Sequence, residues 1–464
     1  MDSPKMNNMM RSRLFFISVF LQLSAIAMAQ QVYNVIDFGA KGNGKVLDSN
    51  AIQKAIDQCY KDGGGTVLIP EGTYLSATIQ LKDHVNLHLE KGAHIIGSTD
   101  YKVYRNLDPF TDGLGVDVGR ALLVAVDAKD ISLTGEGCID GRGKELKEVH
   151  IATDKRPESK RWGLRPFLLR LVRCHQVRVK GITLRNSASW TSHYCQCSDL
   201  TIDSVMIRSK GVAHNDGIDI DGCQRVKISH CDIISGDDAL CFKTTSSKAP
   251  CRDIEVRDMT LKSNQAGIKF GTESMAPFEH IRVHNCYIYD TRNGGIKLFS
   301  VDGAILRDVV ISDVIMNEVR TPMLFRLGAR LSVFRKNVDK QQPIGCFENV
   351  TIKNVSAVAA DEAQLTPPSG ILITGIPGHY ITGLTLENIH IRLLGTGTDE
   401  DAKSVVPEAI DQYPEVKTFG PKIPAYGVWA RHVKGLTLRN VSFDLKNPDQ
   451  RPMILCEDGD INVY

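Results

Sequence analysis

A short pattern of apolar and polar positions recurs along most of the chain. Each copy has an apolar residue or Cys, two polar or mixed residues, and two strand-forming residues separated by one variable position, as in Cys197–Ile202 and Phe278–Val283. Further copies begin at Ala128, Cys174, Cys223, Cys251, Leu306, Phe347, Ile381 and Val433. Because the apolar residues alternate with period two, each copy predicts a β-strand.

The spacing of the copies determines the expected architecture. Their first strand-forming residues fall at positions 177, 200, 226, 254, 281 and 309, so neighbouring copies lie 23 to 28 residues apart. That interval suits one coil of short strands, which buries its apolar face only by stacking on the next coil. The pattern predicts an all-β, right-handed parallel β-helix, since crossovers in parallel sheets are right-handed. Length alone allows two or three domains, but no linker interrupts the repeat, so we expect a single domain.

Stacked coils place equivalent positions in columns. Six of the twelve cysteines fall in two columns, namely Cys174, Cys197, Cys223 and Cys251 in one and Cys231 and Cys286 in the other. Buried free Cys behaves as a small hydrophobe, and these cysteines lack the close pairs typical of zinc sites. We therefore expect apolar ladders, although rungs about 4.8 Å apart also permit disulfides.

The N-terminal segment is typical of a signal peptide. Residues 1–29 combine basic residues with an apolar run over 14–29 and an Ala-x-Ala motif at the end. The apolar run is shorter than the about 18–20 residues of a membrane span, so a membrane anchor is the weaker alternative. The sequence predicts an exported mature chain, residues 30–464, in the periplasm or outside the cell.

Two segments depart from the repeat. Residues 48–60 have helical apolar spacing and predict a helix that caps the open N-terminal end of the β-helix. Residues 395–426 form a long interval rich in charge, Gly and Pro, with enough aromatic residues to predict an ordered wall. The formal net charge of +2 gives no general attraction to nucleic acid or to anionic membranes.

Three carboxylates converge in the aligned coils. Asp216 and Asp238 fall in one column on adjacent coils, and Asp237 precedes Asp238. Neighbouring carboxylates resist simultaneous ionisation, so one can act as a general acid and another as a base, as inverting glycoside hydrolysis requires. A calcium site that includes Asp219 and Asp221, or a role in turns, is the alternative. Strict alternation would place Asp216 inside, beside Ile218, so the turn must break the alternation.

Four short motifs on consecutive coils resemble those of one enzyme family. They are His214–Gly217, Gly236–Asp238, Ala266–Gly267 and Gly295–Lys297, and Arg165–Pro166 and Asn186–Trp190 match its preceding coils. The chain resembles the polygalacturonase family, glycoside hydrolase family 28, of the bacterial pectin-degrading type with a pectin-lyase-like fold. The similarity covers nearly all of the mature chain.

The resemblance implies roles for the carboxylates. Asp237 would protonate the leaving oxygen, and Asp216 and Asp238 would hold and deprotonate the attacking water, with inversion and without a metal or other cofactor. The family's His and Arg are replaced here by Ala266 and Gly295. Contacts to the substrate are therefore expected from other residues, namely Lys269, Lys297, His214 and Arg326, because cations suit a uronate carboxylate. Solvated side chains on an outer sheet are the alternative.

These expectations predict a monomeric glycosidase with a pectic polysaccharide or oligosaccharide as substrate. The lost His and Arg, together with the long segment 395–426, favour an exo-acting galacturonidase. A rhamnogalacturonan hydrolase and an endo-polygalacturonase stay open as alternatives. So do a calcium-dependent pectate-type lyase and a β-helix that binds carbohydrate without cleaving it.

Overall fold

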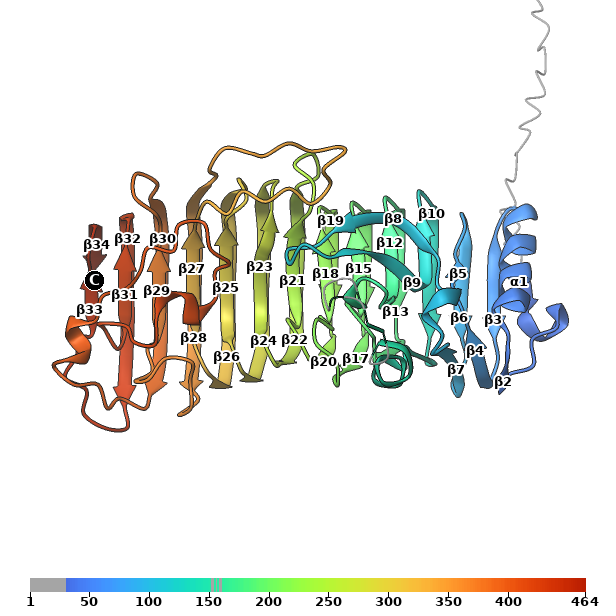
Figure 1. Cartoon of the computed structure of the whole chain (residues 1–464), viewed down its shortest axis with the longest axis horizontal. Coiled ribbons are helices and arrows are strands. Elements are labelled where there is room, and N and C mark those ends of the chain that lie inside the picture. The colour runs from blue at the N-terminus through green and yellow to red at the C-terminus, as the bar shows by residue number, and fades with distance from the viewer. Residues whose placement is uncertain (1–30, 152–153, 156, 158–160) are drawn as a thin grey trace, which may run out of the picture.

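The computed structural model describes residues 31–464, except 152–153, 156 and 158–160, so the predicted signal peptide lies outside the described residues. The chain forms one elongated stack of parallel coils, with the N-terminal helix α1 at one end and the C-terminal strands at the other (Figure 1). This is the predicted right-handed parallel β-helix.

The candidate site lies on one sheet of 13 strands that runs the length of the stack. Its parallel strands are β5 (Ile79–Gln80), β9 (Asp117–Val126), β12 (Phe167–Val172), β15 (Ser192–Cys195), β18 (Ile218–Asp221), β21 (Leu240–Thr244), β23 (Ala266–Ser274), β25 (Gly294–Ser300), β27 (Met323–Leu327), β29 (Ile371–Thr374), β31 (Val428–Arg431) and β33 (Ile454–Cys456). An antiparallel strand, β8 (Asn106–Thr111), pairs with β9. We call this sheet the site sheet.

The remaining strands form a second, 21-stranded parallel sheet that closes the coils. They are β1 (Val32–Asn34), β2 (Asn43–Leu47), β3 (Gly65–Ile69), β4 (Gly72–Ser76), β6 (Val85–Leu89), β7 (Ala93–Gly97), β10 (Lys129–Gly135), β11 (Cys138–Asp140), β13 (His175–Lys180), β14 (Thr183–Arg185), β16 (Ser198–Asp203), β17 (Met206–Ser209), β19 (Gln224–Ser229), β20 (Asp232–Ser235), β22 (Cys251–Ser263), β24 (Phe278–Thr291), β26 (Ile305–Val319), β28 (Cys346–Ala359), β30 (Ile381–Leu393), β32 (Val433–Leu445) and β34 (Gly459–Val463).

The register of this second sheet follows the sequence repeat. The positions from which the coil length was inferred pair in order, as Val226 with Ile254 and Ile254 with Ile281. These positions are buried, and the residues that alternate with them along each strand, such as Glu255 after Ile254, are exposed. Hydrophobic burial along these columns therefore holds successive coils together.

The cysteine columns are also present. Within the part of the chain described, all twelve cysteines are free thiols, and the members of both columns are buried. Cys286 pairs in register with Met259 on one side and Val314 on the other, so thiols and apolar side chains alternate in one ladder. The apolar interpretation of these columns is confirmed.

The predicted capping helix is α1 (Ser49–Lys61), and it buries Ile52, Ala55, Ile56 and Cys59. Gln53 of this helix also hydrogen-bonds the free backbone groups of the edge strand β5. Its amide nitrogen donates to Gln80 O at 3.0 Å, and its amide oxygen accepts from Gln80 N at 2.8 Å. The helix thus covers both an apolar end and an exposed sheet edge. No helix among the described residues is long and apolar enough to cross a membrane.

The long segment 395–426 is an ordered wall against the outer face of the site sheet. Its short helices are η4 (Asp401–Lys403) and η5 (Val416–Phe419), and the other short helices are η1 (Val35–Phe38), η2 (Tyr101–Val103), α2 (Gly143–Leu146) and η3 (Lys147–Ile151). Val416 and Phe419 pack in one apolar cluster with Phe299 and Leu324 of the site sheet. Burial of these side chains fixes the segment beside the candidate site.

The repeat register can be tested by a core substitution. Ile254→Ala should lower the free energy of unfolding by about 2–5 kcal/mol, because it leaves a cavity in an inward column. Glu255→Ala, the outward neighbour, should change it by no more than about 0.5 kcal/mol. Denaturant midpoints of the two variants measure this difference, and equal losses would contradict the register.

Candidate active site

Side chains of the site sheet alternate between the core and the outer face. Ile218, Leu240 and Ile268 form an inward column. The neighbouring outward positions also pair in register, in the order His193, Asp219, Cys241, Lys269 and Lys297. Parallel stacking therefore gathers ionisable groups from five coils into one row on the outer face.

Asp216 and Asp238 occupy one column, as predicted, because Gly217 N donates to Asp238 O at 2.8 Å. Strand β18 begins at Ile218, so Asp216 precedes the strand and alternation does not direct its side chain. Its carboxylate lies on the outer side, 3.5 Å from Lys243 Nζ. The turn before β18 thus resolves the conflict that the sequence posed.

Lys243 is the cation at the centre of three buried carboxylates. Its Nζ lies 3.5 Å from Asp216, 3.6 Å from Asp219 and 3.3 Å from Glu273, and 4.4 Å from the centre of the Trp190 ring. Lys243, Asp216, Asp219 and Glu273 are all at most 4% exposed. One ammonium group therefore compensates several carboxylates that burial would otherwise strongly disfavour.

Burial and nearby charges shift the pKa values of these carboxylates in different directions. Burial, with the adjacent Asp219, raises the pKa of Asp216 well above its usual range, and burial raises the pKa of Asp219 to about 7. Burial opposes ionisation of Glu273 too, but the charges of Lys243 and Arg330 outweigh it and lower the pKa of Glu273 to about 2. Glu273 is therefore charged at neutral pH, and the pair Asp216 and Asp219 retains a proton.

Asp237 and Asp238 differ although they are neighbours. Asp238 accepts hydrogen bonds from Lys269 Nζ at 2.8 Å and from Ala266 N at 3.0 Å, interactions that stabilise a charged carboxylate. Among the described residues, the Asp237 carboxylate accepts only from Asp238 N, at 2.9 Å. Burial and the adjacent Asp238 raise the pKa of Asp237 to about 6. The patch thus holds one carboxylate with a cation and one that retains its proton into the mildly acidic range.

A cavity of about 540 Å³ opens onto this patch. Its lining residues are Leu114, His214, Asp237, Gln265, Lys269, Asn293, Gln364, Gln412, Tyr413, Glu415, Lys417 and Thr418. Five of these come from the segment 395–426, so the predicted wall lines the cavity. A sugar-sized concavity with hydroxyl, amide and charged groups can bind and orient a polar ligand.

The structure brings His214 and Lys269 of the expected substrate contacts to this cavity. Arg165 donates to the imidazole Nδ1 of His214 at 3.1 Å, and Trp162 packs edge-on against the ring. Burial and the charge of Arg165 lower the pKa of His214 to about 4. The ring is therefore neutral at physiological pH and offers a hydrogen bond rather than a charge.

The other two expected contacts are placed differently. Lys297 is 1% exposed, and its Nζ donates to Glu415 at 2.7 Å. Arg326 is equally buried and does not line the cavity, because its guanidinium donates to Thr374 and to the backbone oxygens of Gly375, Glu408 and Ala409. Arg326 thus holds the long segment in place, and the substrate contact expected of it does not fit this position.

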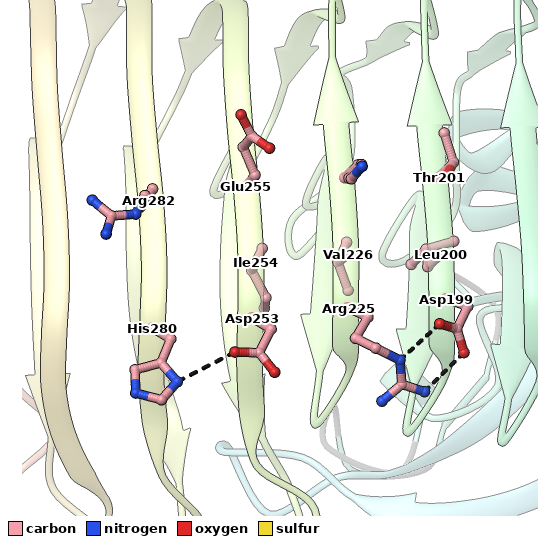
Figure 2. Close-up of a pocket in the computed structure, with 11 residues that line it drawn as sticks. Asp199, Leu200, Thr201, Arg225, Val226, Asp253, Ile254, Glu255, His280 and Arg282 are labelled. Atoms are coloured by element: carbon pink, nitrogen blue, oxygen red, sulfur yellow. Dashed lines mark hydrogen bonds and ion pairs between the residues drawn. The ribbon is translucent and has the colours of Figure 1, made fainter.

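A second hollow, of about 680 Å³, lies on the outer face of the 21-stranded sheet. Four of its charged residues form two pairs near the solvent, Arg225 with Asp199 at 2.7 Å and His280 with Asp253 at 3.2 Å (Figure 2). Exposed pairs of this kind are weak and typical of a solvated sheet face. This hollow is therefore a weaker candidate for an active site than the cavity on the opposite sheet.

A metal ion is a weaker interpretation of the carboxylate patch than proton transfer. Ligand atoms of Asp216, Asp238 and Cys241 lie within 4.8 Å of one another. However, the ammonium groups of Lys243 and Lys269 already contact these two carboxylates. A cation between them would be repelled by both lysines.

The model of the family described as "Glycosyl hydrolases family 28" matches residues 59–408, well over half of the chain. The chain belongs to this family. It is therefore a glycosidase, and the family predicted from the sequence motifs is confirmed.

Individual relatives are distant. A "Probable polygalacturonase" of Vitis vinifera is 24% identical over 391 residues, which cover 80% of this chain and 77% of that protein. The fold is similar to a family 28 exopolygalacturonase of Yersinia enterocolitica, with a TM-score of 0.74, 21% identity and coverage of 94% of this chain and 78% of the other. A hyperthermoactive exopolygalacturonase of Thermotoga maritima gives 0.68 at 22% identity, covering 89% and 92%.

Sequence reasoning missed Glu273 and Glu415 of the site, and it considered Asp219 only for a calcium site and Lys243 only as a further cation for the substrate. Asp219 and Lys243 follow Asp216 and Asp238 at outward positions of their strands, so period two was a usable signal for both. Glu273 lies beyond a register shift between β21 and β23, which removes that signal. Glu415 comes from the long segment, where no repeat indicates a position.

Removal of the central cation tests the charge balance. Lys243→Met should lower the free energy of unfolding by about 3–5 kcal/mol at neutral pH, because buried carboxylates lose their counter-ion. Lys227→Met, an exposed lysine of the same coil, is the matched control.

The pH dependence of this difference gives a second readout. The lowered pKa of Glu273 stabilises the folded wild type above the unfolded pKa of about 4.5, and this contribution is lost as the pH falls towards about 2. The difference between wild type and Lys243→Met should therefore shrink as the pH is lowered. A difference that does not depend on pH would contradict the assignment.

Proposed function

We propose that this glycosidase hydrolyses glycosidic bonds of galacturonic acid in pectic polysaccharides, and that it acts from a chain end with inversion. The observation that carries the proposal is the cluster of Asp216, Asp237 and Asp238 beside a sugar-sized cavity, where the pKa values of Asp216 and Asp237 are raised and Asp238 accepts a hydrogen bond from Lys269. The printed names of the relatives, polygalacturonase and exopolygalacturonase, support the substrate class.

Asp237 is the proposed general acid. Its side chain lines the cavity, and its raised pKa of about 6 keeps a proton available for the leaving oxygen. Asp238 is the proposed base, because Lys269 and an amide stabilise its charged form. Asp216 retains a proton and orients the attacking water. An acid and a base on separate residues, with water between base and anomeric carbon, are the requirement for inversion.

The segment 395–426 supports action from a chain end. It contributes Tyr413, Glu415 and Lys417 to the lining of the cavity, and its apolar side chains are buried against the site sheet. A wall that is fixed in this way blocks one direction in which a long polymer would have to extend. An end of the polymer can still enter.

Export and chain organisation complete the proposal. The mature chain, residues 30–464, is a single β-helix domain that leaves the cell by means of the predicted signal peptide and works as a monomer. This location brings the enzyme to a polymer that is too large to enter a cell.

Asp237→Asn should reduce kcat on pectic oligomers by about 10²–10⁴-fold, because the amide cannot supply a proton to the leaving oxygen. In the wild type, kcat/KM should fall as the pH rises through about 6, since the acid acts only in its protonated form. Asp253→Asn, an exposed aspartate of the other sheet, serves as the control. An active Asp237→Asn enzyme with an unchanged pH profile would assign the acid role elsewhere.

Digestion of long galacturonan oligomers, with and without a chelator and with products resolved by size, tests the mode of action. Release of single galacturonic acid units from the start, without mid-chain fragments, is expected. Early fragments of intermediate length would show endo action. Unsaturated products that disappear with the chelator would show a calcium-dependent lyase.

A further inference from the structure

The wall of the cavity around Lys297 is electrically neutral. Lys297 Nζ donates to Glu415 Oε2 at 2.7 Å, and the Lys297 side chain is 1% exposed while that of Glu415 is 16% exposed at the cavity. The same carboxylate oxygen accepts from the Asn293 amide. Lys297 therefore has a counter-ion from its own chain, at the place where a family resemblance alone would lead one to expect a uronate carboxylate.

Two other residues that line the cavity carry hydrogen-bond acceptors that receive no hydrogen bond from the described part of the chain. Asn293 Oδ1 and Gln364 Oε1 are buried atoms with no hydrogen-bond partner among the described residues. The orientation of the Asn293 amide is determined, because its nitrogen donates to Gln265 Oε1 at 2.6 Å and to Glu415. Asn293 is 4% exposed and lines the cavity. A buried acceptor without a donor is costly until a ligand supplies one.

These acceptors discriminate between two kinds of sugar. Each sugar hydroxyl donates one hydrogen bond, so one hydroxyl can satisfy Asn293 Oδ1 and another can satisfy Gln364 Oε1. An ionised carboxylate has no donor, so it would leave both oxygens unsatisfied, and it would find the charge of Lys297 already engaged by Glu415. The wall is therefore complementary to hydroxyls and opposed to a carboxylate.

We propose that the sugar bound against Lys297, Glu415 and Asn293 is uncharged, so that the enzyme cleaves a galacturonate bond next to a neutral sugar. The inference rests on the proposed function and specifies its substrate. Two sources supply the required chemistry, a neutral deoxyhexose in the backbone and a methyl-esterified galacturonate. Lys417, which is exposed at the same cavity and forms no ion pair within the described part of the chain, is available to an acidic sugar at the rim.

Wild-type enzyme and three sets of oligomers of equal length test the proposal. The sets are unesterified galacturonan, methyl-esterified galacturonan, and oligomers in which galacturonate alternates with rhamnose. We expect kcat/KM for one of the last two to exceed that for unesterified galacturonan by about tenfold or more, as the cost of leaving a buried acceptor without a donor implies. The preferred set identifies the source of the neutral sugar.

The other outcomes distinguish failure of the neutral-sugar inference from failure of the proposed function. Equal or faster cleavage of unesterified galacturonan overturns the neutral-sugar inference and leaves the proposed function intact. Absence of cleavage of all three sets overturns the proposed function itself.

Glu415→Gln provides the test within the chain. The amide keeps the size of the side chain but releases the charge of Lys297 for a substrate carboxylate. We expect kcat/KM on unesterified galacturonan to rise about tenfold relative to the neutral-flanked substrate. Glu400→Gln, in the same segment and paired only with the exposed Lys403, is the matched control and should change neither value. An unchanged ratio in Glu415→Gln would overturn the inference.

Asn293→Ala separates recognition from a general effect on the wall. Loss of its amide oxygen should raise KM for the neutral-flanked substrate several-fold with little change in kcat, since the hydroxyl contact contributes to binding. A parallel loss on charged and neutral substrates would instead show that Asn293 only supports the fold of the wall.

Discussion

In-register stacking of parallel coils is the constraint on which the rest of this molecule depends. Each coil is too small to bury its own apolar face, so Val226, Ile254 and Ile281 are covered only when neighbouring coils align them. The same alignment acts on the outer face, where it brings Asp219, Cys241 and Lys269 into one row. The register that completes the core therefore also assembles the site.

Assembly of the site requires that buried charges be balanced within a few ångströms. Lys243 contacts Asp216, Asp219 and Glu273, and Lys269 contacts Asp238. These cations do not neutralise the patch uniformly. Burial and repulsion raise the pKa of Asp216 and of Asp237, whereas Asp238 accepts hydrogen bonds from Lys269 and from a backbone amide. The difference between these environments, on which acid–base chemistry depends, thus follows from the positions of two lysines.

The segment 395–426 adds selectivity to this scaffold. Arg326 and the apolar cluster of Val416 and Phe419 hold it against the site sheet, and Glu415 then reaches Lys297. This chain lacks the His and Arg that the family motifs usually contain, at Ala266 and Gly295. The cavity instead has the acceptor oxygens of Asn293 and Gln364, which are unpaired within the described residues, and a lysine, Lys297, whose charge is paired with Glu415. We infer that this substitution changes the preferred sugar while the carboxylates that perform the chemistry stay the same.

The sequence by itself determined the fold and the core of the site, because both follow from local periodicity. A period of two within strands and of 23 to 28 residues between coils predicted the β-helix and placed Asp216, Asp237 and Asp238 together. Partners that lie far apart in the sequence were decided only by the tertiary structure. The contact of Glu415 with Lys297 spans 118 residues and comes from a segment without repeats, so no periodicity could indicate it. The position of Arg326 was decided in the same way, because backbone oxygens of that segment bind its guanidinium and hold it away from the cavity.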